Sequence, residues 1–224
     1  LDEEIEVDGE VFHLGGSDLI GRPLSAGNAA HLAAFQLDGN IAHWTFRCGP
    51  LTLRRCLVMP HQRNTACLRY EVTEGPAARI RIRPFLPFRR QDAPLRQPGF
   101  GQFELVLDED GSCRVALPGT ELWLAMRVQP ANAPFVPDAL QVPDAGLWRE
   151  QLRGYESHEA VASPGYFDWQ AAPHEAAVLV FTSEEMHPRA HVERTFDEER
   201  QRNAALVDLA CAQDDPFLAR LAIA

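Results

Sequence analysis

Apolar and polar residues alternate along most of the first 186 positions, in short runs that end at turn-forming residues. Residues 65–73 show the pattern clearly, because Leu68, Tyr70 and Val72 fall on one face of an extended chain while Arg69 and Glu71 fall on the other. Alternation with period two is typical of half-buried β-strands. It predicts further strands over roughly 32–38, 41–48, 51–59, 78–86, 101–107, 112–117 and 121–128.

Turn-forming residues separate these runs. Asp8-Gly9 lies between two short strands, and Asp-Gly is a pair that two-residue hairpins favour. Asp38-Gly39 marks a second turn, and Pro164-Gly165 marks a break. The Pro-rich segment 129–147 predicts irregular structure, with strands resuming over 166–170 and 175–183.

Short strands with turns between them favour an antiparallel sheet over βαβ units. We therefore expect a mainly β fold, a large two-sheet antiparallel β-sandwich over residues 1–187. After Pro188 the sequence becomes charged and helical, with Val192, Phe196 and Val207 on one stripe. This pattern predicts a linker helix over 188–212.

A second helix is predicted immediately afterwards. Asp215 followed by Pro216 is a typical helix start, because proline suits the first helical position. The following apolar run, 217–223, would need another element to cover it. We expect residues 213–224 to be the start of a further helical domain that is missing from this chain.

Composition narrows the class of protein. The net charge of −11 argues against a nucleic-acid partner, which calls for a clustered basic face. No run approaches the roughly 20 apolar residues of a membrane helix, so we expect no membrane partner. The 5 cysteines are odd in number and widely spaced, which predicts neither a zinc site nor a disulfide framework and favours the cytoplasm.

Catalytic and metal motifs are missing from the sequence. The histidines show no H-E-x-x-H spacing, and no phosphate loop, dinucleotide fingerprint or G-x-S-x-G occurs, so we expect no metal and no cofactor. Asp108, Glu109 and Asp110 sit with Gly111 in a predicted hairpin turn, where acidic residues serve solubility. We therefore predict no catalytic residue in this chain.

Weak candidates for binding remain. The segment "MPHQRNT" (59–65) joins two strands, and Pro60 should end the strand pairing there. Its polar residues His61 and Arg63 are either part of a plain turn or placed at the sheet edge to contact a ligand or partner. Trp148 and Tyr155 lie outside any clear strand, and Tyr166 follows a break, so these three are candidate stacking platforms. Arg79, Arg81 and Arg83 share a strand face, which is either solvated or docks an acidic partner domain.

Several stretches resemble the N-terminal domain of bacterial and archaeal glycogen debranching enzymes of the amylo-α-1,6-glucosidase type. They are "FQLDGNIAHWTF", "LTLRRCLVMPHQRNTACLRYEV" with its M-x-H-x-x-N-T loop, "EGPAARIRIRPFLPFR", "SPGYF" and "DDPFLARLAIA". The resemblance extends over nearly all of the chain. After Phe88 the family shows an R-D-x-H-like cluster, whereas this chain has "RRQDAP", which removes the expected sugar contact there.

The resemblance implies a sandwich of the galactose-mutarotase and glucoamylase N-domain kind, lacking its first strands. It also implies a following α/α-barrel domain that carries two carboxylates and hydrolyses α-1,6 links in glycogen-like α-glucans. This chain would then be non-catalytic, and it would pack against the barrel and help to shape its substrate cleft, with His61 and Arg63 facing it.

Two other function classes stay open. A free-standing glucan-binding module would use Trp148, Tyr155 or Tyr166 as stacking platforms, and would bind maltooligosaccharides in titration calorimetry. An aldose epimerase of mutarotase type would need a paired histidine and carboxylate on a concave sheet. No such pair is evident in the sequence, and polarimetry on fresh α-glucose would detect the activity.

We predict that the chain alone has no glycosidase activity. Hydrolysis by a water nucleophile needs two carboxyl groups about 6.5–9.5 Å apart across a sugar-sized cleft. The acidic residues cluster instead near 2–4, at 108–110 and along 193–199. The isolated chain should release no glucose from a branched limit dextrin between about pH 4 and pH 8. Turnover that survives repurification and disappears on one Asp or Glu substitution would contradict this prediction.

Overall fold

The computed structural model describes residues 1–14, 19–20, 30–86, 88, 102–109, 111–129, 133–147, 151–185 and 192–224. One sheet contains strands β1 (Asp2–Val7), β2 (Glu10–His13), β3 (Leu19–Ile20), β8 (Ala78–Arg83), β12 (Phe135–Leu147) and β13 (His158–Ala171). The other contains β4 (Leu32–Asp38), β5 (Ile41–Cys48), β6 (Leu51–Val58), β7 (Thr65–Glu74), β9 (Glu104–Leu107), β10 (Cys113–Ala116), β11 (Trp123–Gln129) and β14 (Ala176–Thr182).

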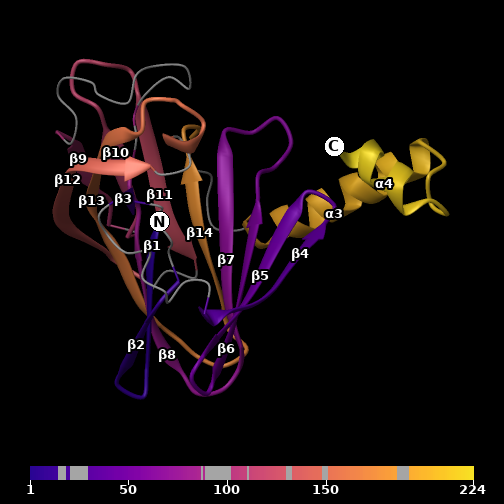
Figure 1. The fold of residues 1–224 in the computed structure, drawn as a ribbon, viewed down its shortest axis with the longest axis horizontal. Helices are drawn as coiled ribbons and strands as arrows, with labels where there is room; N and C mark the ends of the chain where they lie inside the picture. The colour runs from indigo at the N-terminus through magenta and orange to yellow at the C-terminus, as the bar shows by residue number, and fades with distance from the viewer. Residues whose placement is uncertain are drawn as a thin grey trace.

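The two sheets face each other as a sandwich (Figure 1). The six-stranded sheet has the order β2-β1-β8-β13-β12-β3, and the eight-stranded sheet has the order β4-β5-β6-β7-β14-β11-β10-β9. Neighbouring strands pair antiparallel throughout both orders. The predicted fold class, a large two-sheet antiparallel β-sandwich, is confirmed.

The main core fills the space between the sheets. From the six-stranded sheet, Ile5, Ile80 and Phe167 point inward, and from the eight-stranded sheet Leu53 and Leu179 meet them. All five are among the most deeply buried side chains of the chain. On β1 and β8, for example, buried residues alternate with less buried ones, so the alternation in the sequence places one face of these strands in this core.

A charged residue also lies between the sheets. Glu3 on β1 is only 1% exposed, and its carboxylate accepts hydrogen bonds from Arg55 on β6 and from the Tyr70 hydroxyl on β7 at 2.6 Å. Arg55 in turn stacks over Trp44, with its guanidinium carbon 4.3 Å from the ring centroid. Burial, and then the neighbouring Glu3, raise the pKa of Tyr70 well above its usual value, so the hydroxyl stays protonated and donates.

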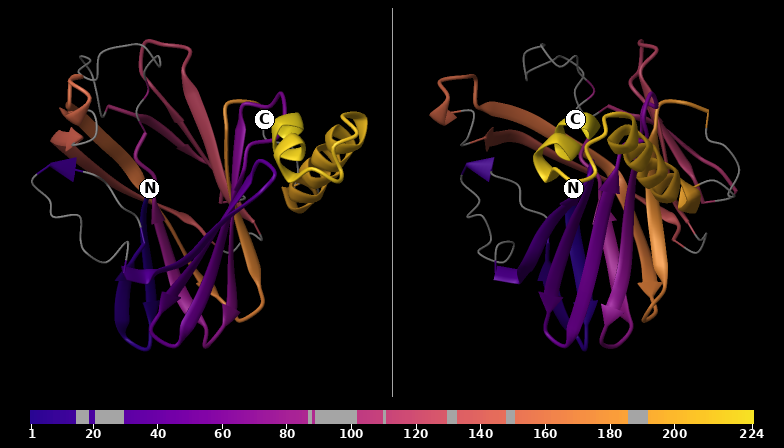
Figure 2. Two further views of the ribbon diagram at one scale, coloured as in Figure 1. Left: turned by 45° about the vertical axis from the view of Figure 1, so that its right-hand side comes forward. Right: turned by 90° about the vertical axis from the view of Figure 1, so that its right-hand side faces the viewer.

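Two helices follow the sandwich. Helix α3 (Val192–Leu209) and helix α4 (Pro216–Ile223) lie on the side of the eight-stranded sheet that faces away from the six-stranded sheet (Figure 2). Phe196 of α3 is buried there in a second, smaller core with Ile41, Val58 and Val180. At the start of α4, the Asp215 carboxylate accepts hydrogen bonds from the backbone N–H groups of the first turn, as the Asp-Pro signal predicts.

Two predicted interruptions of the strands are wrong. Most of the segment expected to be irregular belongs to β12, and Pro164-Gly165 lies inside β13 instead of ending a strand. Irregularities in the pairing of β12 with β13, between Pro137 and Leu140 and between Val142 and Ala145, shift the alternation and hide the strand from a periodicity argument. At Gly165 a Cβ atom would lie 2.1 Å from the Val136 carbonyl oxygen, so this close strand approach requires glycine.

Other features concern the cysteines and the helices. The thiols of Cys48, Cys56, Cys67 and Cys113 are buried and Cys211 is exposed, and all five are free. Burial raises the pKa of Cys48 and of Cys67 to about 11, so these thiols are not nucleophiles at neutral pH.

Within the described ranges, no helix is both long and apolar enough to cross a bilayer.

Removing the Glu3 carboxylate should destabilise the sandwich strongly. Glu3→Ala leaves the Arg55 guanidinium buried without its carboxylate, and we expect the free energy of unfolding to fall by about 3–5 kcal/mol. Chemical denaturation followed by tryptophan fluorescence measures this loss. Glu4→Ala is the matched control, because Glu4 forms a partly exposed ion pair with Arg81 and its loss should cost about 0–1 kcal/mol. Equal losses of unfolding free energy in the two variants would show that the Glu3–Arg55 pair does not stabilise the packing of the two sheets.

Candidate functional site

The loop between β6 and β7 is fixed to the end of β14. Glu184, just after β14, accepts a hydrogen bond from the Asn64 backbone N–H at 2.8 Å and forms an ion pair with Arg63 at 3.5 Å. The Ser183 backbone N–H donates to the Asn64 carbonyl at 3.1 Å. Gln62, between the two candidate residues, has a φ of 59°, which turns the chain so that His61 and Arg63 both lie at the surface. The loop is therefore held in place by the end of β14.

Helix α3 is held to the same region by a buried glutamate. Glu199 is 4% exposed, and its carboxylate accepts hydrogen bonds from Asn40 Nδ2 at 2.8 Å, from the His61 backbone N–H at 3.3 Å and from Arg202. Burial alone would raise the pKa of Glu199, but these hydrogen bonds and the Arg202 charge outweigh it and hold the pKa below its usual value. One carboxylate thus joins the β4–β5 turn, the β6–β7 loop and α3.

A second polar contact reinforces this junction. Asn203 lies one helical turn after Glu199, and its Nδ2 donates to Asn40 Oδ1 at 2.9 Å. Gly39, beside Asn40, has a φ of 60°, and a Cβ atom there would lie 2.4 Å from Asn203 Nδ2. The β4–β5 turn can approach α3 this closely because position 39 has no side chain.

A cavity of about 660 Å³ opens between α3 and the eight-stranded sheet, beside the β6–β7 loop. Most of the described residues that line it have polar or charged groups, although apolar atoms, including stems of these side chains, supply much of the wall. The polar ones are His61, Arg63, Thr65, Arg127, Thr182, Glu184, Glu185, Thr195, Glu198, Glu199 and Arg202, and the others are Pro60, Cys67, Val180 and Val192. Guanidinium groups donate hydrogen bonds to hydroxyl oxygens, and carboxylate groups accept hydrogen bonds from hydroxyl groups. The described walls include no phenylalanine, tyrosine or tryptophan, so a sugar bound there would be held mainly by hydrogen bonds.

A second hollow of about 570 Å³ lies where α4 meets the sheet. Met59 and His61 line it from the β6–β7 side, and Ile223 and Ala224 line it from the end of α4. His61 therefore borders both hollows, which makes the β6–β7 loop the place where the sheet, α3 and α4 come together.

The other sequence candidates do not join this site. Tyr166 on β13 lies on the outer face of the six-stranded sheet, and the guanidinium carbons of Arg81 and Arg83 lie 4.9 Å and 5.2 Å from its ring centroid. Tyr155 is exposed in the turn after residue 152, and Trp148 lies outside the described residues. Of the four candidates that the structure describes, His61 and Arg63 line one cavity, while Tyr155 and Tyr166 are not among the residues that line it.

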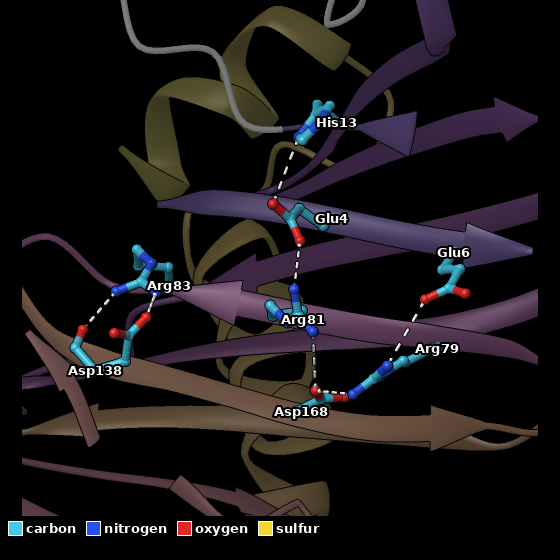
Figure 3. A network of polar contacts seen from close by, with 8 residues as sticks. All are labelled: Glu4, Glu6, His13, Arg79, Arg81, Arg83, Asp138 and Asp168. Atoms are coloured by element: carbon cyan, nitrogen blue, oxygen red, sulfur yellow. Dashed lines mark hydrogen bonds and ion pairs between the residues drawn. The ribbon is translucent and has the colours of Figure 1, made fainter. Parts of the chain in front are cut away.

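The arginine face of β8 is paired within the chain itself (Figure 3). Asp168 of the neighbouring strand β13 accepts two hydrogen bonds from Arg79, at 2.7 Å and 2.8 Å, and lies 3.5 Å from Arg81. Arg81 also bonds Glu4 at 3.0 Å, and Arg83 bonds Asp138. With their charges compensated by these carboxylates, the arginines favour a solvated network over docking to an acidic partner.

The histidines and cysteines do not form a catalytic centre in the described structure. Cys56 Sγ lies 3.0 Å from His43 Nδ1, but burial raises the pKa of Cys56 and lowers the pKa of His43, so both groups stay neutral. Among the described residues no group of three His, Cys, Asp or Glu side chains is arranged to hold a metal ion. In the turn at 108–112, Asp108 accepts a hydrogen bond from the Ser112 hydroxyl at 3.0 Å, which is a structural role.

Sequence reasoning missed Glu199, Asn203, Asn40 and Glu184. Glu199 and Asn203 continue the stripe of Val192 and Phe196 at the spacing of one helix face. A charged residue and an amide on the apolar stripe were the available signal that this helix docks onto polar partners. Nothing in the local sequence marks Glu184, because its partners lie 120 residues away.

A family model described as glycogen debranching enzyme N terminal matches residues 1–178. No curated protein matches the chain.

Solved structures match at low identity. A mutant of heparan sulfate lyase HepC from Pedobacter heparinus matches with a TM-score of 0.45 and 9% identity over 70% of this chain, which spans 22% of the lyase chain. A protein from Escherichia coli K12 with a provisional assignment as an aldose 1-epimerase matches with a TM-score of 0.38 and 12% identity, over 80% of this chain and 78% of its own. At such identities the likeness says nothing about substrate.

Neutralising Glu199 should loosen α3 in a pH-dependent way. Glu199→Gln should lower the free energy of unfolding by about 1.5–3 kcal/mol at pH 7. Because the folded pKa lies below the ordinary value of 4.5, this advantage of the unsubstituted chain is complete above about pH 4.5 and disappears as the pH falls through the folded pKa. Urea titrations at several pH values measure the difference, with the exposed neighbour Glu198→Gln as the control. A difference that stays constant down to about pH 3 would contradict the assignment.

Proposed function

Because the chain belongs to the family of glycogen debranching enzyme N-terminal domains, we propose that it is the non-catalytic N-terminal domain of an α-1,6-glucosidase that acts on glycogen-like α-glucans in the cytoplasm. In this proposal its role is to dock onto a C-terminal α/α-barrel domain that holds the catalytic carboxylates. The family match over residues 1–178 is the observation that carries the assignment.

Helix α4 supports a docking role. None of its residues is buried, and its apolar side chains Phe217, Leu218 and Leu221 are exposed. An eight-residue helix is marginal in water unless packing stabilises it, so an apolar face of this kind is suited to contact with another domain. We assign residues 213–224 to the beginning of that helical domain and 188–212 to the linker.

The junction beside α4 supports a defined orientation for the docked domain. Glu199 and Asn203 fix α3 to two loops of the sheet, and hydrogen bonds to a buried charged group resist bending more than an apolar contact does. A linker anchored in this way can hold the following helix, α4, at a fixed angle to the sheet. The polar cavity with His61 and Arg63 would then border the substrate cleft, where its hydrogen-bonding groups suit glucan hydroxyls.

The two rival functions have less support. In a glucan-binding module, Tyr166 would need a free ring, but Arg81 and Arg83 lie close over it. An epimerase would need a histidine and a free carboxylate together. His13 and Glu4 lie 3.9 Å apart, yet they are on the outer face of the six-stranded sheet, and Glu4 is hydrogen-bonded to Arg81.

A change on the α4 face should weaken docking. The C-terminal part of the parent enzyme, produced separately, should bind the 224-residue chain, and Leu221→Asp should weaken that binding at least about tenfold because it places a charge in an apolar contact. Leu152→Asp is the matched control, since Leu152 is 72% exposed and Leu221 is 58% exposed. Titration calorimetry measures both affinities. Equal affinities for the two variants would rule out α4 as the docking face.

A further inference from the structure

The cavity between α3 and the eight-stranded sheet has two unlike walls. One wall belongs to α3, where the lining residues recur at spacings of three and four and so share a helix face: Val192, Thr195, Glu198, Glu199 and Arg202. The other wall consists of β7, β11, β14 and the β6–β7 loop. Among the described residues, α3 contributes Phe196 and the partly buried Val192 to the apolar core between these walls. A ligand in the cavity would therefore touch both the linker helix and the sandwich.

The cavity has the size and the depth of a small-molecule site. Its volume of about 660 Å³ lies within the range of about 300–1,000 Å³ that is usual for such sites. Three of its polar lining residues, Arg127, Thr182 and Glu199, are each 4% exposed. Polar groups therefore lie deep in the cavity as well as at its mouth, and a few buried polar groups are what fixes the orientation of a ligand in such sites.

The charges of the described lining indicate the class of ligand. They come from three arginines, Arg63, Arg127 and Arg202, and from four glutamates, Glu184, Glu185, Glu198 and Glu199. An anionic ligand would meet more carboxylate than guanidinium groups, in a chain whose net charge is −11. A cationic ligand would compete with Arg63 and Arg202, which already pair with Glu184 and Glu199. The lining therefore favours a neutral ligand.

Hydrogen-bond donors and acceptors both remain available around the cavity. Arg202 donates from Nε to Glu199 and from Nη2 to Asn203, and its Nη1 has no partner within the described ranges. The His61 ring and the Glu198 carboxylate also have no partner in the part of the chain that the structure describes. A hydroxyl group both donates and accepts, so a ligand with many hydroxyl groups can use these donors and acceptors together. A neutral saccharide has this chemistry.

We propose that the cavity binds a short segment of a neutral saccharide chain, an α-glucan, and that the bound segment bridges α3 and the sheet. Hydroxyl groups on one side of the sugar bond Glu198 and Arg202 of α3, and those on the other side bond the β6–β7 loop and the strands. These bonds add to the packing of Phe196, so an occupied cavity holds the linker helix in place more firmly than an empty one. The saccharide class follows from the lining, whereas the choice of an α-glucan rests on the proposed function.

Titration calorimetry of the 224-residue chain with maltotriose tests the site. We expect weak but saturable binding, and Glu198→Leu should weaken it at least about tenfold because the ligand loses a carboxylate acceptor. Asp197→Leu is the matched control. It removes the same charge from the neighbouring position of α3, and Asp197 is exposed and not among the described lining residues, so the affinity should not change. A lack of saturable binding, or equal affinities of the two variants, overturns the proposal.

Two further ligands test the class of ligand. Inorganic phosphate should not compete with maltotriose, because the lining has more carboxylate than guanidinium groups. Competition by phosphate overturns the neutral class. Cellotriose should bind more weakly than maltotriose, because its different linkage places the hydroxyl groups of successive rings elsewhere. Equal affinity for cellotriose overturns the choice of an α-glucan.

Amide hydrogen exchange tests the bridge. Maltotriose should slow exchange in α3 and in the β6–β7 loop, and it should have a much smaller effect on Glu198→Leu at the same concentration. Binding that leaves exchange in α3 unchanged overturns the bridge. Slower exchange confined to the segments around Tyr155 and Tyr166 would place the sugar on an aromatic platform, and overturns the site.

Docking of the separately produced C-terminal part is a different measurement from sugar binding. A chain that docks but binds no maltotriose would overturn this inference and leave the proposed function standing. A chain that binds maltotriose in the cavity but does not dock would support this inference and count against the proposed docking role.

Discussion

The buried contact of Glu3 with Arg55 and Tyr70 fixes how the two sheets meet. A carboxylate taken out of water between two apolar layers is tolerated only if charge and hydrogen bonds satisfy it, and here both partners come from the opposite sheet. Apolar side chains alone would allow the sheets to slide or rotate by small amounts at little cost. The Glu3 carboxylate accepts its bonds in one geometry, so the register between the first strand and the middle of the opposite sheet becomes specific.

The eight-stranded sheet is covered on both faces at its centre and left open at its edge. Its inner face belongs to the main core, while Val178 and Val180 of β14 lie against the smaller core under α3. A strand covered on both faces reads as a continuous apolar run, and the sequence of β14 has that form. All seven residues of β4 are exposed, and its apolar side chains Phe35 and Leu37 are about as exposed as polar surface residues. The covered centre of this sheet therefore stabilises the fold, and its exposed edge strand is available for contacts.

Sequence patterns predicted the fold where local chemistry determines it. The Asp8-Gly9 and Asp38-Gly39 turns, the alternation on β7 and the Asp-Pro start of α4 all depend on neighbouring residues, and the structure has each of them. The long pair of β12 and β13 has no clear signature in the sequence, because irregular pairing interrupts the period and because prolines usually end strands. Prolines are tolerated in such a strand where the pairing is irregular, and a single sequence does not show where that occurs.

The candidate site, too, depends on contacts that a local sequence pattern does not show. His61 and Arg63 were identifiable because polar residues in a short loop are visible in the sequence, yet what gives the loop its place is Glu199, 138 residues further along the chain. Such long-range polar contacts form only after both sheets and α3 are in position, so no local pattern encodes them. The described stacking candidate Tyr166 lies elsewhere for the converse reason. Aromatic residues were selected for their chemistry alone, and strand topology placed Tyr166 on the outer face of the other sheet, where arginines of β8 lie over its ring. In a sandwich, the side chains of the neighbouring strand determine whether an aromatic ring is open for a sugar to stack on or is covered by packing.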